Sequence, residues 1–488
     1  MEIAPMSDDF QMHKISRALD LLSGVLVERQ SEVAAELAEL AIELQPTGSS
    51  DPDYVAAVAE VRAAVHRATP VGARLAVVSR GDDQLLRYAH RSAQHPSATS
   101  DGRYCGFHPQ SGRVALAQLE AAHWRGAQYF VLPALSSWWL EHYPELASHL
   151  ERRYTVVDDG GAAIVWSLEQ PSPFRELEEL FVDFRYGCGR DPAVLLWGAQ
   201  EDVRTAFPEL NVFSPISDET DLPYLDASID IVVIPPDAAE MMSEARRVAS
   251  FAVVECGAGT PSNVVWQSAV VGTDGPGVSV IVTDHGRPHA DAHLRALFDS
   301  FPRGFQGEVL LLVEDADALR QRVDLNSLTE PVKIVEAPAG NFAGSVLTAV
   351  HAATEETVVV VDAATVLLPG WLPRLLSALR DVPGAGAVSG MVLEPDGRLV
   401  QSRRPVDRAT SVYEVSDPAH VHVADCELGD LDLIATRRSL LLVTAALSGS
   451  DAPSVIRHYC AHLAASGHRV VYEPDVLAVR DRQEHCDV

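Results

Sequence analysis

Carboxylates that directly follow apolar runs are the residues in this chain whose type and spacing best fit chemistry. Asp362 ends a run of four valines, and Glu314 and Asp315 follow the apolar run Val309–Val313. Such runs predict buried parallel strands, and α/β sheets bind ligands at the carboxyl ends of these strands. A carboxylate at Asp362 is suited to a divalent cation, but Ala364 stands where a second carboxylate would complete a pair.

The motifs around Asp362 follow a definite order from about residue 277 to residue 479. An apolar strand begins at Val278, Pro369-Gly370-Trp371-Leu372 follows the valine run, and Gly467-His468-Arg469-Val470 comes near the end. In this order the segment resembles the family-2 inverting glycosyltransferases with the A-type nucleotide-diphosphosugar fold. The resemblance implies a sugar-nucleotide donor, a divalent cation held at a strand end, and a carboxylate base that takes a proton from the acceptor hydroxyl.

The resemblance also assigns roles to particular residues. It implies that Thr283, Asp284, Glu314 and Asp315 contact the nucleotide, and that Asp362 binds Mg²⁺ or Mn²⁺ if the protein is active. The donor is then a nucleotide-diphosphosugar, and the acceptor is a hydroxyl group of a glycan, a lipid or a small molecule.

Two of the family's acids are replaced in this chain. Ala364 occupies the second position of the metal motif, and the acidic pair that carries the catalytic base falls on Val455-Ile456. The nearest acids that can substitute are Asp451, which we take as the candidate base, and those in Asp425–Asp432. Removing one positioned acid or base typically costs ~10²–10⁴-fold in rate. We therefore expect a glycosyltransferase-like protein with weakened or lost catalysis; the alternative is a non-catalytic pseudo-glycosyltransferase that acts as a binding or scaffold protein.

The expected fold class is α/β and multidomain, with Rossmann-like units followed by an A-type glycosyltransferase-like domain. Residues 1–50 carry apolar positions at helical spacing and predict an amphipathic helical segment. This segment either packs on the next domain or forms an arm for a homo-oligomer or a protein partner. We expect a small α/β domain at 51–170, a Rossmann-like domain at 171–272 and the glycosyltransferase-like domain at 273–488.

The Rossmann-like domain contains the segment Leu222–Ile234, which resembles the middle of the class I methyltransferase fold. A methyl-donor or dinucleotide site needs bare backbone at successive glycines after the first strand, so that the chain can approach the ligand. Here that turn reads Gly198-Ala199-Gln200-Glu201-Asp202, with one glycine followed by two acids. We therefore expect a degenerate unit kept for packing or protein contact.

Two smaller sets of residues contain possible metal ligands but lack the other features of a metal site. Cys105 and His108 form a Cys-x-x-His pair with no second pair nearby, and His285, His289 and His293 recur every four residues without a general base. We expect Cys105 and His108 to be ordinary loop residues, and we expect the three histidines to lie on a solvated helix face.

The charge and composition of the chain indicate which partners and which cellular compartment to expect. The net charge of −31 opposes binding to nucleic acid. The six cysteines form no Cys-x-x-Cys pair, which favours the reduced thiols of the cytosol. No run is long and apolar enough for a membrane span, and no export signal is visible at the start, so we expect a cytoplasmic protein.

Overall fold

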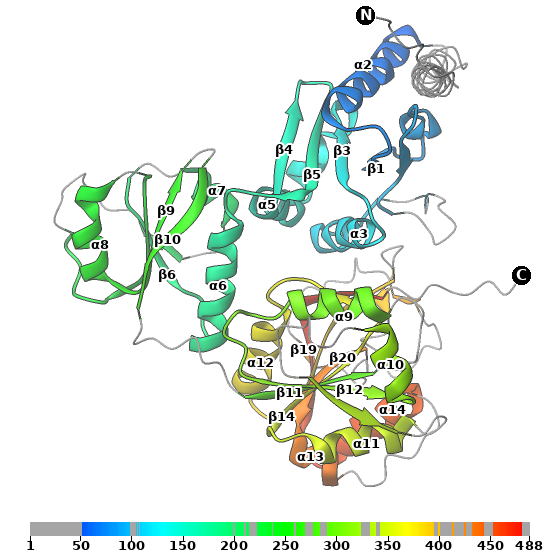
Figure 1. The fold of residues 1–488 in the computed structure, drawn as a ribbon, viewed down its shortest axis with the longest axis vertical. Helices are drawn as coiled ribbons and strands as arrows, with labels where there is room; N and C mark the ends of the chain where they lie inside the picture. Colours follow the sequence, from blue (N-terminus) through cyan, green and yellow to red (C-terminus); the bar gives the residue numbers. More distant parts are fainter. Residues whose placement is uncertain are drawn as a thin grey trace, which may run out of the picture.

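The structure is a computed structural model that describes most of residues 51–480. Its gaps are 98–103, 105, 107, 199–200, 209–210, 214–221, 237, 258–259, 269–276, 284–289, 324–331, 338–341, 395–398, 401–411, 414–423, 426–431 and 444–451. The expected helical segment at residues 1–50 lies outside the described residues, as do Asp284 and Asp451. The chain forms three α/β units, each built on its own sheet, which stand as three lobes in Figure 1.

The amino-terminal unit is built on a five-stranded sheet in the order β2-β1-β3-β5-β4. The strands β1 (Arg74–Val77), β2 (Ser92–Gln94) and β3 (Tyr129–Pro133) are parallel to one another. Strand β5 (Ala163–Pro171) pairs antiparallel with β3 and with β4 (Tyr154–Asp159). Its helices are α2 (Pro52–Ala68), α3 (Gly112–Trp124), α4 (Trp138–His142) and α5 (Pro144–Arg153), with 3₁₀ turns η1 (Asp83–Leu86) and η2 (Ala134–Ser136).

The middle unit is a second five-stranded sheet in the order β10-β9-β8-β6-β7. Its strands are β6 (Ala193–Leu196), β7 (Asn211–Phe213), β8 (Ile229–Ile234), β9 (Ala249–Gly257) and β10 (Thr260–Gln267), of which only β10 is antiparallel to its neighbour among the described strands of this sheet. Its helices are α6 (Arg175–Cys188), α7 (Glu201–Ala206) and α8 (Met242–Val248), with the 3₁₀ turn η3 (Ala239–Met241).

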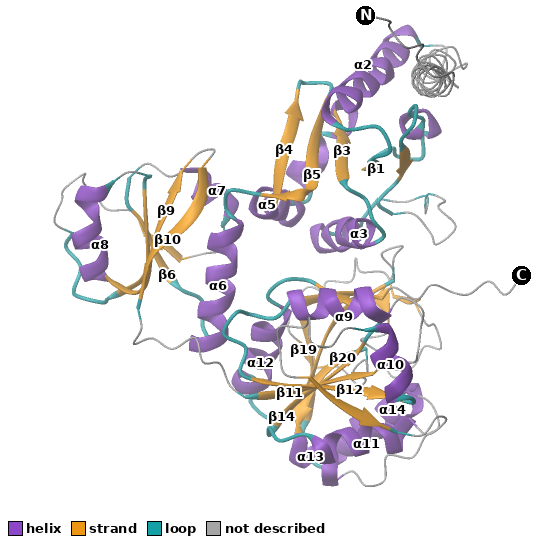
Figure 2. Ribbon diagram, viewed as in Figure 1, coloured by secondary structure: helices purple, strands orange, loops and turns teal. Residues whose placement is uncertain are grey.

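The carboxy-terminal unit contains the largest sheet, shown in Figure 2 as the strands at the centre of the lower lobe. Its central order is β13-β12-β11-β14-β20-β16, with β21 alongside β16. The long strands are β11 (Val278–Thr283), β12 (Gly307–Val313), β13 (Val332–Glu336), β14 (Thr357–Asp362), β16 (Ala385–Leu393), β20 (Leu433–Arg437) and β21 (Arg469–Arg480). The short strands are β15 (Thr365–Leu367), β17 (Leu399–Val400), β18 (Val412–Tyr413) and β19 (Ala424–Asp425).

Helices cover this sheet on both faces. They are α9 (Ala290–Asp299), α10 (Ala316–Arg322), α11 (Phe342–Ala352), α12 (Trp371–Asp381), α13 (Arg438–Val443) and α14 (Ala452–Ala465). Because both faces are covered, every residue of β11 and all but the first of β14 are buried. Burying one such valine side chain stabilises the fold by roughly 1.5–3 kcal/mol relative to exposure, before entropy costs.

Helix α12 shows how the sequence builds this packing. Gly370 precedes it with a φ of 79°, a left-handed conformation that glycine adopts without a steric penalty. Trp371, Leu372 and Leu375 then recur at helical spacing and are buried against the sheet. The indole N–H of Trp371 donates to Ser300 Oγ at 2.9 Å, so the buried ring leaves no polar atom without a partner.

The sequence-based fold class is confirmed: the protein is α/β and multidomain, with Rossmann-like units followed by the larger sheet. The domain boundaries at residues 50, 170 and 272 stay predictions. Within the described parts of the chain, no helix is both long enough and apolar enough to cross a membrane.

Charged contacts join the middle unit to the carboxy-terminal unit. The backbone N–H of Arg303 donates to Asp183 Oδ1 at 2.9 Å, and the Arg303 guanidinium pairs with Glu176 and Glu179 on the same helix, α6. Farther along the interface, Arg380 of α12 donates to the carbonyl of Gly189 at 2.7 Å. Burial raises the pKa of Asp183 to about 6, against the opposing effect of the Arg303 backbone hydrogen bond.

The raised pKa of Asp183 gives a stability test. A carboxyl whose folded-state pKa lies above its unfolded value favours folding at low pH, and this contribution is lost as the pH rises from about 4 to about 6. Asp183→Asn keeps an oxygen acceptor for Arg303 and removes the buried charge. We expect the variant to have a higher free energy of unfolding at pH 8, by up to about 3 kcal/mol, in urea titrations.

The same variant should match the unaltered protein at about pH 3 and below, where Asp183 is mostly protonated in both the folded and the unfolded state. An unchanged or lower free energy of unfolding at pH 8 would show that the Asp183 charge is well solvated or favourably paired with Arg303.

Candidate functional site

The sequence-predicted residues that the structure describes lie at one edge of the carboxy-terminal sheet. Thr283 is the last residue of β11 and stands beside Asp362, the last residue of β14, in the parallel register. The N–H of Ala363 donates to the Thr283 carbonyl at 3.0 Å, which holds the two strand ends together. Thr283 also stands beside Leu312 of β12, so Glu314 follows two residues beyond that point at the same edge.

Asp362 is held in a tight turn. Its side chain is only 7% exposed, and its Oδ1 accepts the N–H of Ala364 at 2.8 Å. Its own N–H donates to the carbonyl of Asp432 at 3.1 Å. One carboxylate oxygen therefore shapes the turn after β14, a local role that short acidic side chains commonly play.

A partly buried arginine lies close to this turn, and the sequence reasoning missed it. Arg480, at the end of β21, pairs with Asp432 and also donates to Glu394 at 3.3 Å. Asp432 was one of the acids nominated as a substitute base, but its carboxylate is occupied by this guanidinium. The pairing of Arg480 with Asp432 is not readable from the sequence, because it depends on the register that places Arg480 beside Thr365 of β15.

The two acids after β12 differ in their surroundings. Glu314 is exposed, whereas Asp315 is the N-cap of α10 and accepts the N–H groups of Asp317 and Ala318, both at 2.9 Å. Asp315 thus satisfies two of the donors left open at the start of a helix. Thr283 is buried and its hydroxyl donates back to the Val361 carbonyl at 3.4 Å.

The position expected for a catalytic base lies in the core. Val455 and Ile456 are buried on α14 and pack in the same cluster as Tyr459 and Leu463. Across the described ranges, no three His, Cys, Asp or Glu side chains come together in a group that fits a metal ion.

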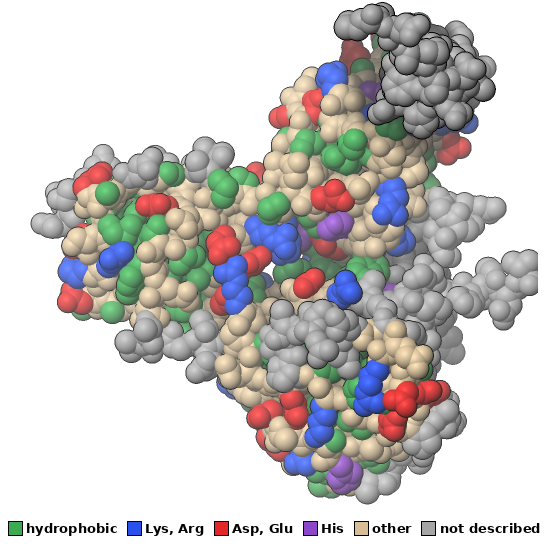
Figure 3. Space-filling view, in the orientation of Figure 1, with side chains coloured by type: hydrophobic (Ala, Val, Ile, Leu, Met, Phe, Trp, Pro, Cys, Tyr) green, Lys and Arg blue, Asp and Glu red, His purple; other side chains and the backbone are tan. Residues whose placement is uncertain are grey.

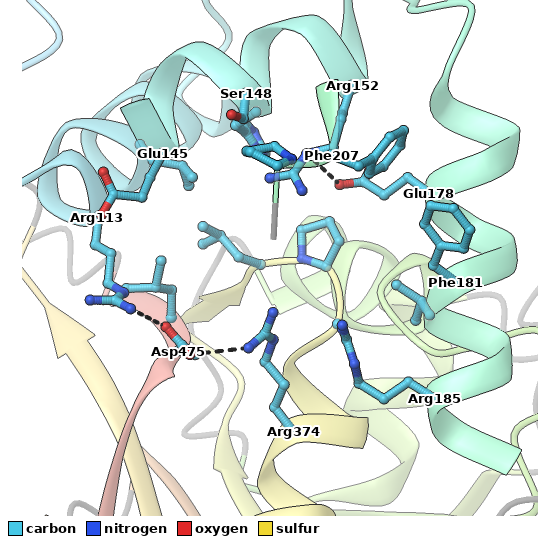
Figure 4. A pocket seen from close by; sticks show the side chains of 18 of the residues that line it. Arg113, Glu145, Ser148, Arg152, Glu178, Phe181, Arg185, Phe207, Arg374 and Asp475 are labelled. Carbon is cyan, nitrogen blue, oxygen red and sulfur yellow. Dashed lines mark hydrogen bonds and ion pairs between the residues drawn. The ribbon is translucent and has the colours of Figure 1, made fainter. Parts of the chain in front are cut away.

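A cavity of about 540 Å³ lies where the three units meet. Figure 4 shows Arg152 of α5, Arg185 of α6 and Arg374 of α12 entering it from three different elements. Charged side chains of both signs also gather at this junction in the space-filling view of Figure 3. The lining contains four arginines and four acids: Arg113, Arg152, Arg185 and Arg374, with Glu145, Glu178, Asp191 and Asp475.

Ion pairs across the cavity hold the units together. Asp475 of β21 pairs with Arg113 of α3 and accepts from Arg374 at 3.1 Å, so one carboxylate joins the amino- and carboxy-terminal units. Burial lowers the pKa of Arg374, the nearby Arg185 lowers it further, and Asp475 opposes both effects. Because its arginines are matched by acids, we interpret the cavity as a polar joint rather than as a binding site for a single anion.

In the middle unit, two acids of the segment Leu222–Ile234 are bound by arginines. Asp230 accepts two hydrogen bonds from Arg190 at 2.6 and 2.8 Å, and Asp226 accepts from Arg247 at 2.7 Å. Gly198 has a φ of 92°, and a Cβ at this position would lie 2.7 Å from the Pro235 side chain. These contacts give Asp226, Asp230 and Gly198 structural roles, so the presence of these residues does not require a cofactor site.

One expectation about the histidines is wrong. His293 does not lie on a solvated face: it is buried, with its ring 4.7 Å from the ring of Trp124 on α3. It therefore packs between the amino- and carboxy-terminal units. His285 and His289 lie outside the described residues.

Removing the carboxylate that joins two units tests the role of the cavity. We expect Asp475→Ala to lower the free energy of unfolding by about 1 kcal/mol or more, because Arg113 and Arg374 then lose a shared partner. The exposed pair of Arg380 and Asp381 offers the matched control, and Asp381→Ala should change stability by less than about 0.5 kcal/mol. Equal effects of the two variants in thermal melts would argue against a structural joint.

Comparisons with known proteins found solved structures to which part of this chain is similar. No protein-family model matches the sequence, and no curated protein matches it. The similar structures are a Pyrobaculum calidifontis mannosyltransferase with GDP-mannose and Mn²⁺ (22% identity, TM-score 0.33), GalNAc-T7 with UDP, GalNAc and Mn²⁺ (11%, 0.35), and Staphylococcus aureus TarS with UDP-GlcNAc (15%, 0.30).

The matches cover 43%, 42% and 43% of this chain and 58%, 44% and 60% of those chains, respectively, so the chain spans less than two thirds of each. All three are glycosyltransferases, and over less than half of its length this chain is similar to them.

Proposed function

We propose that residues 277–479 form a glycosyltransferase-like domain in which sugar transfer is weakened or lost. The observation that carries this proposal is the turn after β14, where Asp362 stands beside Thr283 at the carboxyl edge and binds the N–H of Ala364. At this edge the position that would hold a second carboxylate carries only the methyl group of Ala364.

The chemistry of donor binding explains why this turn matters. A leaving diphosphate carries several negative charges, which a divalent cation normally neutralises while carboxylates hold the cation in place. Asp362 alone supplies one carboxylate, and one of its oxygens already accepts a backbone hydrogen bond. The described residues at this edge therefore do not make up a two-carboxylate metal site, and we assign no catalytic step to a bound metal.

If a sugar nucleotide binds, the proposed contacts are those of the resemblance. Glu314 is exposed at the strand end and free to meet a nucleotide, whereas Asp315 has a helix to cap. Thr283 and Asp284 are the other proposed nucleotide contacts, Asp362 is the proposed ligand of any Mg²⁺ or Mn²⁺, and Asp451 is the proposed base. Each lost acid would cost ~10²–10⁴-fold in rate.

A scaffold or binding role is the second candidate, and the interfaces favour it. Asp183, Arg303 and Asp475 all make contacts between units of the chain, so these charged groups have a structural use. The helical segment at residues 1–50 remains the proposed arm for a homo-oligomer or a protein partner.

Calorimetry on the full chain separates these functions. We expect UDP or GDP to bind weakly, with less than about a tenfold effect of Mn²⁺, which corresponds to about 1.4 kcal/mol. Ala364→Asp restores the missing carboxylate and should make binding depend on Mn²⁺ by more than this amount. Asp362→Asn keeps an oxygen for the Ala364 N–H and should leave both stability and nucleotide affinity nearly unchanged.

Micromolar, Mn²⁺-dependent binding by the unaltered chain that Asp362→Asn abolishes would contradict the proposal and support a working enzyme. Absence of nucleotide binding in the unaltered chain and in both variants would instead favour the scaffold function.

A further inference from the structure

Several buried side-chain polar atoms of the amino-terminal unit have no hydrogen-bond partner within the described structure, and four of them belong to side chains near one end of its sheet. They are Ser79, His95 at its Nε2, Ser136, and Trp139 at its Nε1, and each is at most 1% exposed. Buried polar groups in folded proteins are nearly always paired, because an unpaired one costs the loss of its hydration. Four of them near one end of one sheet call for a specific explanation.

Strand pairing brings three of these residues to one edge of the sheet. The parallel register places Ala76 beside Gln94 and Val77 beside Val131. His95 therefore directly follows the end of β2, and Ser79 lies two residues beyond the end of β1. Ser136 follows the end of β3 in the turn η2. This is the carboxyl edge of three parallel strands, the place where open α/β sheets bind ligands.

Aromatic rings link this edge to Trp139. The His95 ring lies 6.2 Å from that of Trp139 and 4.4 Å from that of Tyr104, measured between centroids. At Gly81, just after Ser79, a Cβ would stand 3.0 Å from the Tyr104 ring. Its φ of +83° also disfavours any side chain, so backbone and ring come close at this point.

The protonation state of His95 follows from its contacts. The N–H of Ser97 donates to His95 Nδ1 at 3.0 Å, so Nδ1 is an acceptor. Burial lowers the pKa of His95 to about 3, and the nearby His108 lowers it further. The ring is therefore neutral at physiological pH and carries its proton on Nε2, the atom with no partner among the described residues.

The four groups are thus uncharged, and they favour one class of ligand. Nε2–H of His95 and Nε1–H of Trp139 donate, whereas the two serine hydroxyls both donate and accept. Phosphate and carboxylate sites generally rely on arginine, lysine or a helix N-terminus, none of which is among the four. Hydroxyl groups of a neutral ligand, next to aromatic rings, match both the donors and the acceptors.

We propose that the carboxyl edge of β2, β1 and β3, with Ser79, His95, Ser136 and Trp139, is a binding site for an uncharged sugar. This site belongs to the amino-terminal unit and is independent of any donor pocket in the carboxy-terminal sheet. Its polar groups would receive their missing hydrogen bonds from the sugar hydroxyls.

Saturation-transfer NMR and calorimetry on the full chain test the site. The probes are the methyl glycosides of glucose, mannose, galactose and rhamnose, together with N-acetylglucosamine and inorganic phosphate. We expect at least one sugar to bind and phosphate not to bind. Ser79→Ala and Ser136→Ala should each weaken sugar binding by about tenfold or more.

Thermal melts of the same variants provide a second readout. Because neither hydroxyl has a hydrogen-bond partner among the described residues, each alanine variant should have an unchanged or raised Tm. Ser167→Ala is the matched control: its hydroxyl is buried in the same unit but accepts the Gln170 N–H at 3.2 Å, so this change should lower Tm and leave sugar binding intact.

Three results would overturn the proposal. They are binding of none of these sugars at millimolar concentration, sugar binding that both serine variants retain, and phosphate binding that competes with the sugar. A clear fall in Tm for Ser79→Ala and Ser136→Ala would also count against it, since the hydroxyls would then have structural partners.

Discussion

The pairing of β14 on both of its sides is the constraint on which the candidate site depends. This strand is parallel to β11 and antiparallel to β20, and its valines are buried between two layers of helices. The register puts Asp362 beside Thr283 and brings its N–H to the carbonyl of Asp432. The position of Asp362 therefore follows from sheet packing, and it would persist whether or not the protein turns over a substrate.

The two carboxyl edges of this protein contrast in how their polar groups are used. At the edge of the carboxy-terminal sheet, Asp362, Asp315 and Asp432 accept hydrogen bonds from the backbone or from Arg480. At the edge of the amino-terminal sheet, Ser79 and Ser136 are buried and lack partners among the described residues. The first pattern is that of a site whose acids have structural roles, and the second is that of a site built for a ligand.

Local patterns predicted much of the fold, because they depend on neighbours in the sequence. The valine run before Asp362 and the apolar run Val309–Val313 each indicated a strand that the structure contains. Contacts between distant segments were not readable: Ser79 and Ser136 are far apart in the chain, and only the pairing of β1 with β3 brings them to the same edge of the sheet. Asp315 looked like a nucleotide ligand because its sequence position fits both that role and a helix cap.

Turnover of a sugar nucleotide tests most directly whether this sheet edge has lost its chemistry. The full chain would be incubated with UDP- and GDP-sugars and Mn²⁺, and ³¹P and ¹H NMR would follow release of the nucleoside diphosphate and the anomeric configuration of the sugar. With Ala364 in place of a second carboxylate, we predict release at the rate of the protein-free control. Release well above that control, with inversion at the anomeric carbon and loss of activity in Asp362→Asn, would contradict it.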